Sequence, residues 1–263
     1  MDYIFKNALE FCVFSYFKIS FDKDVSNLID ILVKKAYEDA TMQNAFNALI
    51  EKGNGNLRNK ANEAGGKAIE LVINWLKLFS SKHDISYRDW HNQLCNEIGG
   101  FFNDVKKNKV SLWSYGNSQK LVNMSVKYVV LLSSVFKELD KRNEAQEELC
   151  KIGQFFTKNI SNLDIPVDSF IIEALWEKDK HDPKATIPIK KRIKNNTVLG
   201  AYSDDKYKPW SKWSQTEYET FEKSLKDYVE KQTEFKNAFD WESHAWIDIA
   251  KGRRKDDSDK DRE

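Results

Sequence analysis

Lys120 and Asp168 each have a reactive side chain and each stand near the predicted start of a helix. Lys120 follows an aromatic turn at 113–116 and stands in the first turn of a predicted helix. The positive end of the helix dipole disfavours a cation there, so this position favours the neutral amine that nucleophilic attack on carbon requires. Asp168 stands where an extended segment enters the next helix, and a carboxylate at such a point accepts backbone N–H groups. It can then stabilise a cationic transition state or take a proton.

Each feature also has an ordinary structural interpretation. A lysine in the first turn of a helix is commonly a solvated surface residue. The run Ile-Pro-Val-Asp at 165–168 is also a common way to begin a helix, because a proline holds the residue before it out of the helical conformation. Neither feature alone indicates catalysis.

The elements that must position these residues are predicted to be helices. The chain has 263 residues, of which 41% are apolar, with only 10 Gly and 4 Pro, too few chain breakers for a turn-rich all-β fold. Ser86 and Ser214 are predicted to cap helices, the latter in a capping box with Glu217. We therefore expect an all-α fold. Apolar residues recur at helical spacing over 3–18, 23–38, 41–52, 57–80, 86–107, 117–142, 143–158, 214–236 and 240–250.

The sequence predicts a single helical domain over residues 1–250, with lobes that meet near 81–86. A charged tail at 251–263 has no apolar residue and is expected to be disordered. The polar segment 177–213 contains three of the four prolines and is expected to be a surface excursion with a short basic helix. The glycine-rich run at 52–56 is interpreted as a turn, since the Gly-Lys-Ser/Thr sequence of a phosphate loop does not follow it.

Charge and cysteine content limit the classes of function. The net charge of +1 excludes a strongly basic coat but allows a local basic groove. Three cysteines far apart, with no Cys-x-x-Cys pair, fit a reducing cytoplasm. His91 and Cys95 share a predicted helix face, yet two ligands are too few for zinc, so we expect no metal and no cofactor. The charges of Lys6 and Glu10 in the apolar first helix argue against a signal peptide or a spanning helix.

The two motifs resemble those of the helix-hairpin-helix DNA glycosylases, most closely the archaeal 8-oxoguanine branch. The lysine motif is the run KLVNMSVK at 120–127 within an apolar helix, and the aspartate motif is IPVD at 165–168. The resemblance implies an all-α, two-lobed fold with a base pocket between the lobes. It implies that Lys120 is the nucleophile that forms a Schiff base with C1′ of the sugar, and that Asp168 assists departure of the base. Strand nicking by β-elimination (AP lyase activity) can follow.

On this hypothesis the chain excises a flipped, modified or damaged base, in DNA repair or in defence against modified phage DNA. DNA is the expected partner, with no membrane partner and a monomeric protein. Aromatic residues near the motifs are candidates to stack on the base: Trp113, Tyr115 and Trp176. Candidate contacts to the DNA backbone are Lys106, Lys107, Lys109, Gly116, Ser118, Lys127, Lys190, Lys191 and Arg192.

Two other functions compete with this hypothesis. A non-catalytic helical protein that binds DNA or another partner can use the same turn and helix for phosphate contact only. A helical ribonuclease of the toxin type requires a histidine four to six residues after an arginine. Arg88 and His91 are only three positions apart, which makes that class a poor match.

Overall fold

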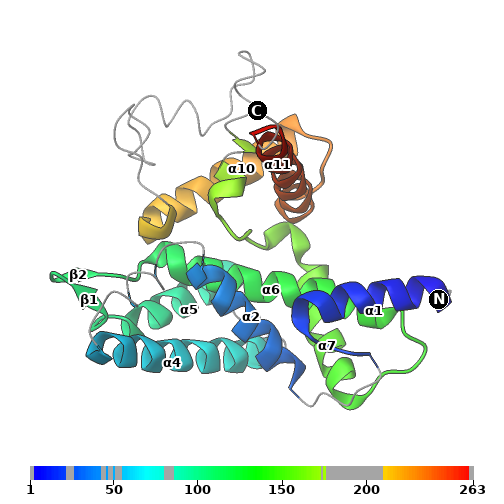
Figure 1. The fold of residues 1–263 in the computed structure, drawn as a ribbon, viewed down its shortest axis with the longest axis horizontal. Coiled ribbons are helices and arrows are strands. Elements are labelled where there is room, and N and C mark those ends of the chain that lie inside the picture. Colours follow the sequence, from blue (N-terminus) through cyan, green and yellow to red (C-terminus); the bar gives the residue numbers. More distant parts are fainter. Residues whose placement is uncertain are drawn as a thin grey trace. The chain divides into compact units, whose positions relative to one another are not determined.

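The computed structural model describes residues 3–21, 27–42, 46, 50, 55–79, 86–172, 174–175 and 210–260. Its described part is helical except for one two-stranded hairpin and the connecting loops, which confirms the all-α prediction (Figure 1). Within the described ranges, no helix has both the length and the apolar run needed to cross a membrane.

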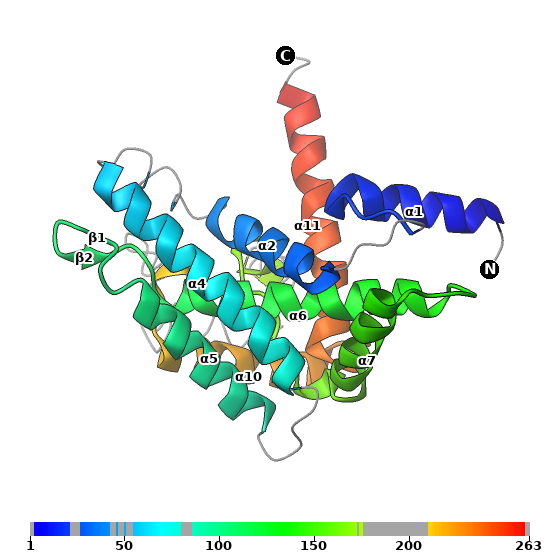
Figure 2. The ribbon, with the colours of Figure 1, turned by 90° about the horizontal axis from the view of Figure 1, so that it is seen from below.

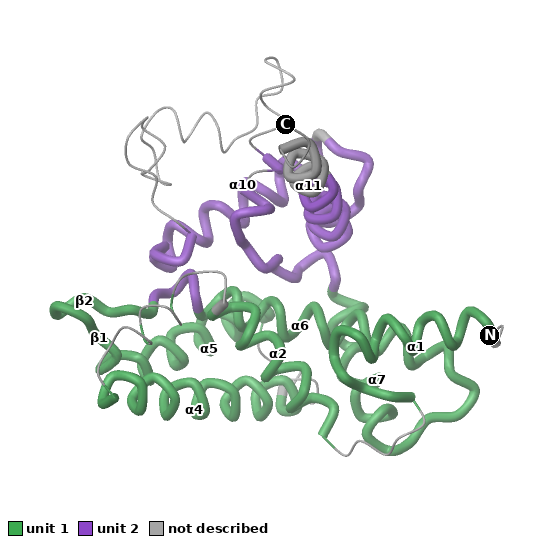
Figure 3. The backbone as a smooth tube through the Cα atoms, in the orientation of Figure 1, with its two compact units in different colours: residues 1–113, 118–159 green, residues 114–117, 160–263 purple. Residues whose placement is uncertain are grey.

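The chain divides into two compact units (Figure 3). Unit 1 comprises residues 1–113 and 118–159, and unit 2 comprises residues 114–117 and 160–263. The lobes were expected to meet near 81–86, but the helices on both sides of that stretch belong to unit 1, and residues 80–85 lie outside the described residues. The division falls instead in the first turn of helix α6, Tyr115–Lys137, whose first three residues count with unit 2.

Unit 1 is a bundle of helices whose apolar faces meet in one core. Helix α4 lies beside α5 and α2 in this bundle (Figure 2), and α2 also packs on α1 and α7. Side chains at helical spacing fill the core, among them Leu32 and Val33 of α2, Val72 of α4 and Leu94 of α5, as the sequence pattern predicts. Besides α6, the helices are α1 (Tyr3–Phe17), α2 (Leu28–Met42), α4 (Gly55–Phe79), α5 (Tyr87–Phe101) and α7 (Glu144–Lys158).

Local sequence sets several helix boundaries in unit 1. The Ser86 side chain accepts a hydrogen bond from the backbone N–H of Asp89, so the predicted cap of α5 is present. Helix α4 begins at Gly55, inside the predicted turn at 52–56, and it runs unbroken through Gly65. A Cβ at Gly65 would meet the Tyr37 side chain, so this glycine allows α2 and α4 to approach closely.

A short β-hairpin follows α5, where the sequence pattern predicted a continuing helix. Strands β1 (Lys106–Lys107) and β2 (Val110–Ser111) are antiparallel. The two turn residues, Asn108 and Lys109, have φ values of 51° and 65°, as a type I′ turn requires. Asparagine tolerates this left-handed conformation better than most residues. The predicted helix at 86–107 therefore ends earlier, at Phe101, and the lysines near its end lie on the hairpin.

Unit 2 has its own hydrophobic core, built largely from aromatic residues. Helix α10 (Gln215–Gln232) begins with the predicted capping box of Ser214 and Glu217 and packs against α11 (Ala238–Lys260). Two 3₁₀ turns, η1 (Ile160–Asn162) and η2 (Trp210–Lys212), complete the described elements together with helical residues from 169 onward. The largest core side chains of unit 2 are Trp210, Trp213, Tyr218, Phe221, Tyr228 and Trp241.

Helix α11 continues to Lys260, so residues 251–260 are helical where a disordered tail was expected. The absence of apolar residues removes any reason to pack, but Lys, Arg and Asp side chains do not stop a helix that has already begun. Of the polar segment 177–213, only residues 210–213 are described, as η2 and the residue that follows it.

Candidate functional site

The start of α6 is tied to the η2 region within unit 2. The Ser114 hydroxyl donates to the carbonyl oxygen of Ser211 (2.6 Å). The side-chain oxygen of Asn117, the third residue of α6, accepts from the backbone N–H of Ser114 (3.1 Å), as the third residue does in a capping box. The backbone N–H of Gly116 donates to the carbonyl oxygen of Trp213 (3.1 Å), and a Cβ at Gly116 would collide with the backbone of Trp210. The N–H of Gly116 is therefore used inside the protein, which argues against the predicted contact with a DNA phosphate.

Two further predicted contact residues, Trp113 and Ser118, lie in the core of unit 1. Trp113 is 5% exposed, stacks on Phe102 with ring centroids 3.9 Å apart, and donates its indole N–H to Ser118 Oγ (2.9 Å). The Trp113 ring is thus packed in the core, and the Ser118 hydroxyl oxygen accepts its indole N–H. Neither prediction, of a base-stacking Trp113 or of a phosphate-binding Ser118, agrees with this packing.

Lys120 follows in the same helix and is 1% exposed. It is the only buried lysine or arginine among the described residues. Lysines are almost never fully buried, because the charged ammonium loses its hydration. The sequence placed Lys120 in the first turn of a helix beginning near residue 117, whereas α6 begins at Tyr115 and Lys120 lies in its second turn. Nothing in the sequence indicated this burial.

The helix around Lys120 buries an unusual number of polar side chains. Asn123 Nδ2 donates to Gln119 Oε1 (3.2 Å), and the Tyr87 hydroxyl of α5 lies 3.4 Å from Asn123 Oδ1. These three residues were missed by the sequence analysis. The available signal was the spacing of Gln119 and Asn123, four positions apart on one face of an otherwise apolar helix. The buried polar residues of this stretch are Asn117, Ser118, Gln119, Lys120, Asn123 and Ser125.

Asp168 occupies the helix start that the sequence predicts. Its Oδ1 accepts from the backbone N–H groups of Phe170 (2.9 Å) and Ile171 (3.2 Å), and the residue is 5% exposed. Two N–H dipoles therefore fix the orientation of the carboxylate at the positive end of the helix. The extended residues before Asp168 are buried, including Asp164, which pairs with Lys226 Nζ at 2.6 Å.

The predicted basic and aromatic contacts are found in different settings. Lys106, Lys107 and Lys109 are all exposed on the β-hairpin, where they can reach an anionic partner. Lys127 is half-buried on α6. Tyr115 is half-buried and packs on Tyr218, with ring centroids 5.6 Å apart. Four predicted contact residues lie outside the described residues: Trp176, Lys190, Lys191 and Arg192.

His91 and Cys95 face each other in the core of unit 1, as their spacing predicts. The Cys95 sulfur lies 3.7 Å from His91 Nε2, and both residues are buried. No group of three or more His, Cys, Asp or Glu side chains gathers as a metal site in the part of the chain that the structure describes. The pair is therefore a core contact between neighbouring turns of α5.

Together these observations give a buried lysine in unit 1, an oriented carboxylate in unit 2 and an exposed basic hairpin. An amine withdrawn from water is suited to attack on an electrophilic carbon, and a fixed carboxylate is suited to stabilising positive charge. Comparison of the chain with protein-family models, with curated proteins and with solved structures found no match.

Proposed function

We propose that this chain is a DNA glycosylase that excises a modified or damaged base, with Lys120 as the nucleophile and Asp168 as the assisting carboxylate. The observation that carries the proposal is the burial of Lys120, at 1% exposure, in the first turns of α6. Keeping a lysine side chain away from water costs free energy, and such groups are concentrated where chemistry uses them.

The proposed reaction divides the work between the two groups. The C1′–N bond of the target nucleotide breaks, and the base leaves with the bonding electron pair and takes up a proton. Asp168 stabilises the positive charge that develops on the sugar. The Lys120 amine forms a bond to C1′ and loses a proton, which gives an imine after the sugar ring opens. Loss of the 3′ phosphate by β-elimination then nicks the strand.

Access to Lys120 is part of the proposal. Its amine can meet a sugar only after the side chains around it move, so we expect local opening of unit 1 when DNA binds. The exposed lysines of the β-hairpin support DNA as the partner, because they can neutralise backbone phosphates without any rearrangement. This binding step is independent of base identity and therefore suits a repair enzyme and an enzyme directed at modified phage DNA equally.

The decisive experiment is covalent trapping. The full chain is incubated with an abasic-site duplex and sodium borohydride, and separately with duplexes carrying modified bases and with modified phage DNA. We expect a reduced covalent adduct with abasic DNA, absent in Lys120→Gln and unchanged in Lys151→Gln, an exposed lysine of α7. Released base identifies the substrate.

The other outcomes of this experiment are equally clear. Base release without an adduct means that water is the nucleophile and that Lys120 has another role. DNA binding with neither adduct nor released base favours a non-catalytic DNA-binding protein, the alternative that the exposed hairpin also supports.

A further inference from the structure

Helix α1 carries its apolar side chains on the outside. Among its residues, Ile4 is 76% exposed, Phe5 58%, Phe11 72% and Phe14 48%. Ala8, Cys12 and Ser15 complete this exposed surface, which we call the α1 face. On a helical wheel of 100° per residue these positions form one continuous arc, which also contains the exposed Asn7 and no charged residue of the helix. Lys18, just past the helix, lies at one edge of the face, with Nζ 5.8 Å from the Phe14 ring centroid and 3.0 Å from the Ser15 carbonyl oxygen. An apolar surface of this kind marks an interaction site more often than an ordinary part of a monomer.

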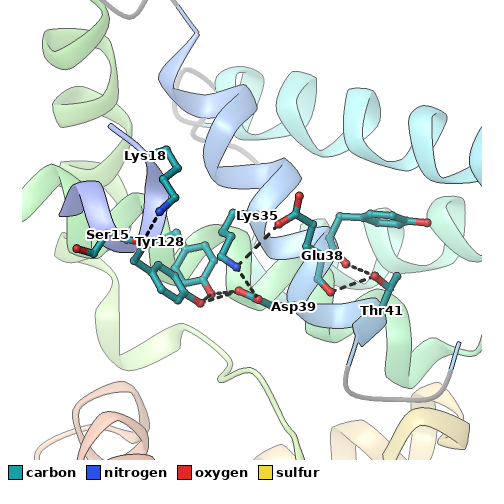
Figure 4. A network of polar contacts seen from close by, with 9 residues as sticks. Ser15, Lys18, Lys35, Glu38, Asp39, Thr41 and Tyr128 are labelled. Atoms are coloured by element: carbon teal, nitrogen blue, oxygen red, sulfur yellow. Dashed lines mark hydrogen bonds and ion pairs between the residues drawn. The ribbon is translucent and has the colours of Figure 1, made fainter. Parts of the chain in front are cut away.

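Polar contacts fix α1 with this face outward. Figure 4 shows the network at the end of the helix, where Asp39 of α2 meets Tyr128 of α6 and Lys35. Asp39 Oδ2 accepts from the Tyr16 hydroxyl (2.7 Å) and from the Tyr128 hydroxyl, and Asp39 Oδ1 accepts from Lys35 Nζ (3.0 Å).

A second anchor holds the middle of α1. Glu10 Oε1 accepts from the Ser20 hydroxyl (2.8 Å) and from the backbone N–H of Phe21 (2.9 Å), while Val13 is buried. The charged side chain of Glu10 therefore serves the inner side of the helix. Since the inner side makes these specific contacts, rotation of α1 to hide its phenylalanines would break them.

We propose that the α1 face binds the α1 face of a second copy of this chain, so that the protein forms a symmetric dimer. This replaces the monomer expected from the sequence. An apolar surface whose one cation, Lys18, lies at its edge is buried at least cost against another apolar surface, because that cation can stay in water. Two copies of the α1 face satisfy this condition in a two-fold arrangement.

The extent of the α1 face fits a reversible dimer. With about 200 Å² for each large side chain, the exposed portions of Ile4, Phe5, Phe11 and Phe14 offer roughly 500 Å² per copy, against about 800 Å² per partner in a standard interface. A dissociation constant in the micromolar range is the corresponding expectation. A lipid surface is a poorer match, because helices that lie on membranes carry rows of Lys and Arg beside the apolar face, whereas the only basic side chains of α1 and the next residue are Lys6 and Lys18.

Cys12 provides a direct probe of the dimer. It is the exposed cysteine of the chain, since Cys95 and Cys150 are buried, and it lies within the α1 face. The full chain is treated with a short bismaleimide at concentrations spanning the micromolar range. We expect a covalent dimer in the unmodified chain and none in Cys12→Ser. A yield of covalent dimer that levels off above the dissociation constant separates the dimer from random collision, for which the yield keeps rising with concentration.

Sedimentation equilibrium on two charge variants completes the test. Phe11→Glu places a charge in the α1 face and should weaken the dimer by at least about tenfold, as removal of a central aromatic contact does. Leu78→Glu changes a similarly exposed apolar residue on α4 (50% exposed) and should leave the dimer unchanged. A monomer at all concentrations, without Cys12 cross-linking, overturns the proposal. So does flotation of a monomeric chain with phosphatidylcholine–phosphatidylglycerol vesicles that Phe11→Glu abolishes.

Discussion

The backbone N–H of Gly116 and the carbonyl oxygen of Trp213 are joined by a hydrogen bond of 3.1 Å. This contact holds the first turn of α6 against the η2 region of unit 2. The approach is so close that the carbonyl oxygen of Trp210 occupies the space where a side chain at Gly116 would begin. Gly116 is therefore a packing residue, although the sequence suggested a contact to DNA.

Gly116→Ala should destabilise unit 2. The added methyl group meets backbone atoms of Trp210, which cannot rotate away, so we expect a loss of about 2 kcal/mol, within the range for overpacked sites. Urea unfolding followed by tryptophan fluorescence measures it. Gly100→Ala is the matched control: it lies in α5 with open space around the new methyl group, and it should stabilise by about 0.5 kcal/mol. Equal effects of the two changes would contradict the packing described for Gly116.

Lys226→Met should cost about 2 kcal/mol of stability, because it removes the partner of a buried charge. The Asp164 side chain is 2% exposed and lies 2.6 Å from Lys226 Nζ. Adding Asp164→Asn to the variant should recover much of the loss, since no uncompensated carboxylate then remains. Lys231→Met, on the same helix, breaks an exposed pair with Asp227 at 3.9 Å and should cost less than about 0.5 kcal/mol. Chemical unfolding of the four chains decides between these expectations.

Alkaline pH should destabilise unit 1. Burial raises the pKa of Tyr37 from 10.0 to about 12, and burial, together with the contacts to Asp39, also raises the pKa of Tyr128. The folded chain holds these phenols protonated, so their contribution is complete below pH 10 and is lost as the pH rises from 10 towards 12. The free energy of unfolding should fall there by about 1.4 kcal/mol per pH unit for each such phenol. Tyr37→Phe should reduce the dependence of the unfolding free energy on pH by about 1.4 kcal/mol per pH unit, the contribution of one phenol. An unchanged slope would contradict the burial of the Tyr37 hydroxyl.

Replacing Lys106, Lys107 and Lys109 by Ala should weaken DNA binding for every sequence alike. If each lysine contacts a phosphate, the slope of log binding constant against log salt should fall by about 2.7. The control triple variant changes Lys141, Lys151 and Lys158, which are equally exposed but lie in and beside α7. Fluorescence anisotropy with a labelled duplex gives both slopes. Identical slopes for the two triple variants would show that the hairpin does not contact DNA.

Asp168→Asn should abolish base excision while it preserves the fold. Asparagine accepts the N–H groups of Phe170 and Ile171 as aspartate does, so the melting temperature should change little. Excision should fall about a hundredfold or more, because the negative charge that stabilises the sugar is gone. Asp168→Ala is the structural comparison, since it loses both charge and cap and should cost about 1 kcal/mol of stability. Full activity in Asp168→Asn would exclude the proposed role of the carboxylate.

The sequence was sufficient to predict features that depend on neighbours along the chain. Helical periodicity identified the helices around the core, and Ser86 and Ser214 were recognised as caps because a capping bond spans only three residues. The start of α6 before Lys120 and the cap at Asp168 follow from the same local rules.

Features that depend on distant contacts were missed or misassigned. Trp113 was placed in a base pocket because an aromatic turn shows no sign, in its own sequence, that Phe102 will stack on it. The burial of Lys120 depends on residues outside its own helix and cannot be inferred from that helix alone. The hairpin was overlooked because Asn108-Lys109 is a weaker turn signal than Asn-Gly, although both turn residues adopt the same left-handed conformation.

Unit 2 is built from two separate stretches of the chain, residues 114–117 and 160–263, and this affects how the protein folds during its synthesis. The Ser114 hydroxyl donates to the carbonyl oxygen of Ser211, 97 positions later in the chain, whereas the residues that make up unit 1 end at residue 159. At about 5–20 residues per second, the ribosome delivers Ser211 roughly 5 to 20 seconds after Ser114. Unit 1 can thus fold during synthesis. The first turn of α6 cannot form its hydrogen bonds to the η2 region until that region has been synthesised. During that interval the turn is accessible to a chaperone or a protease.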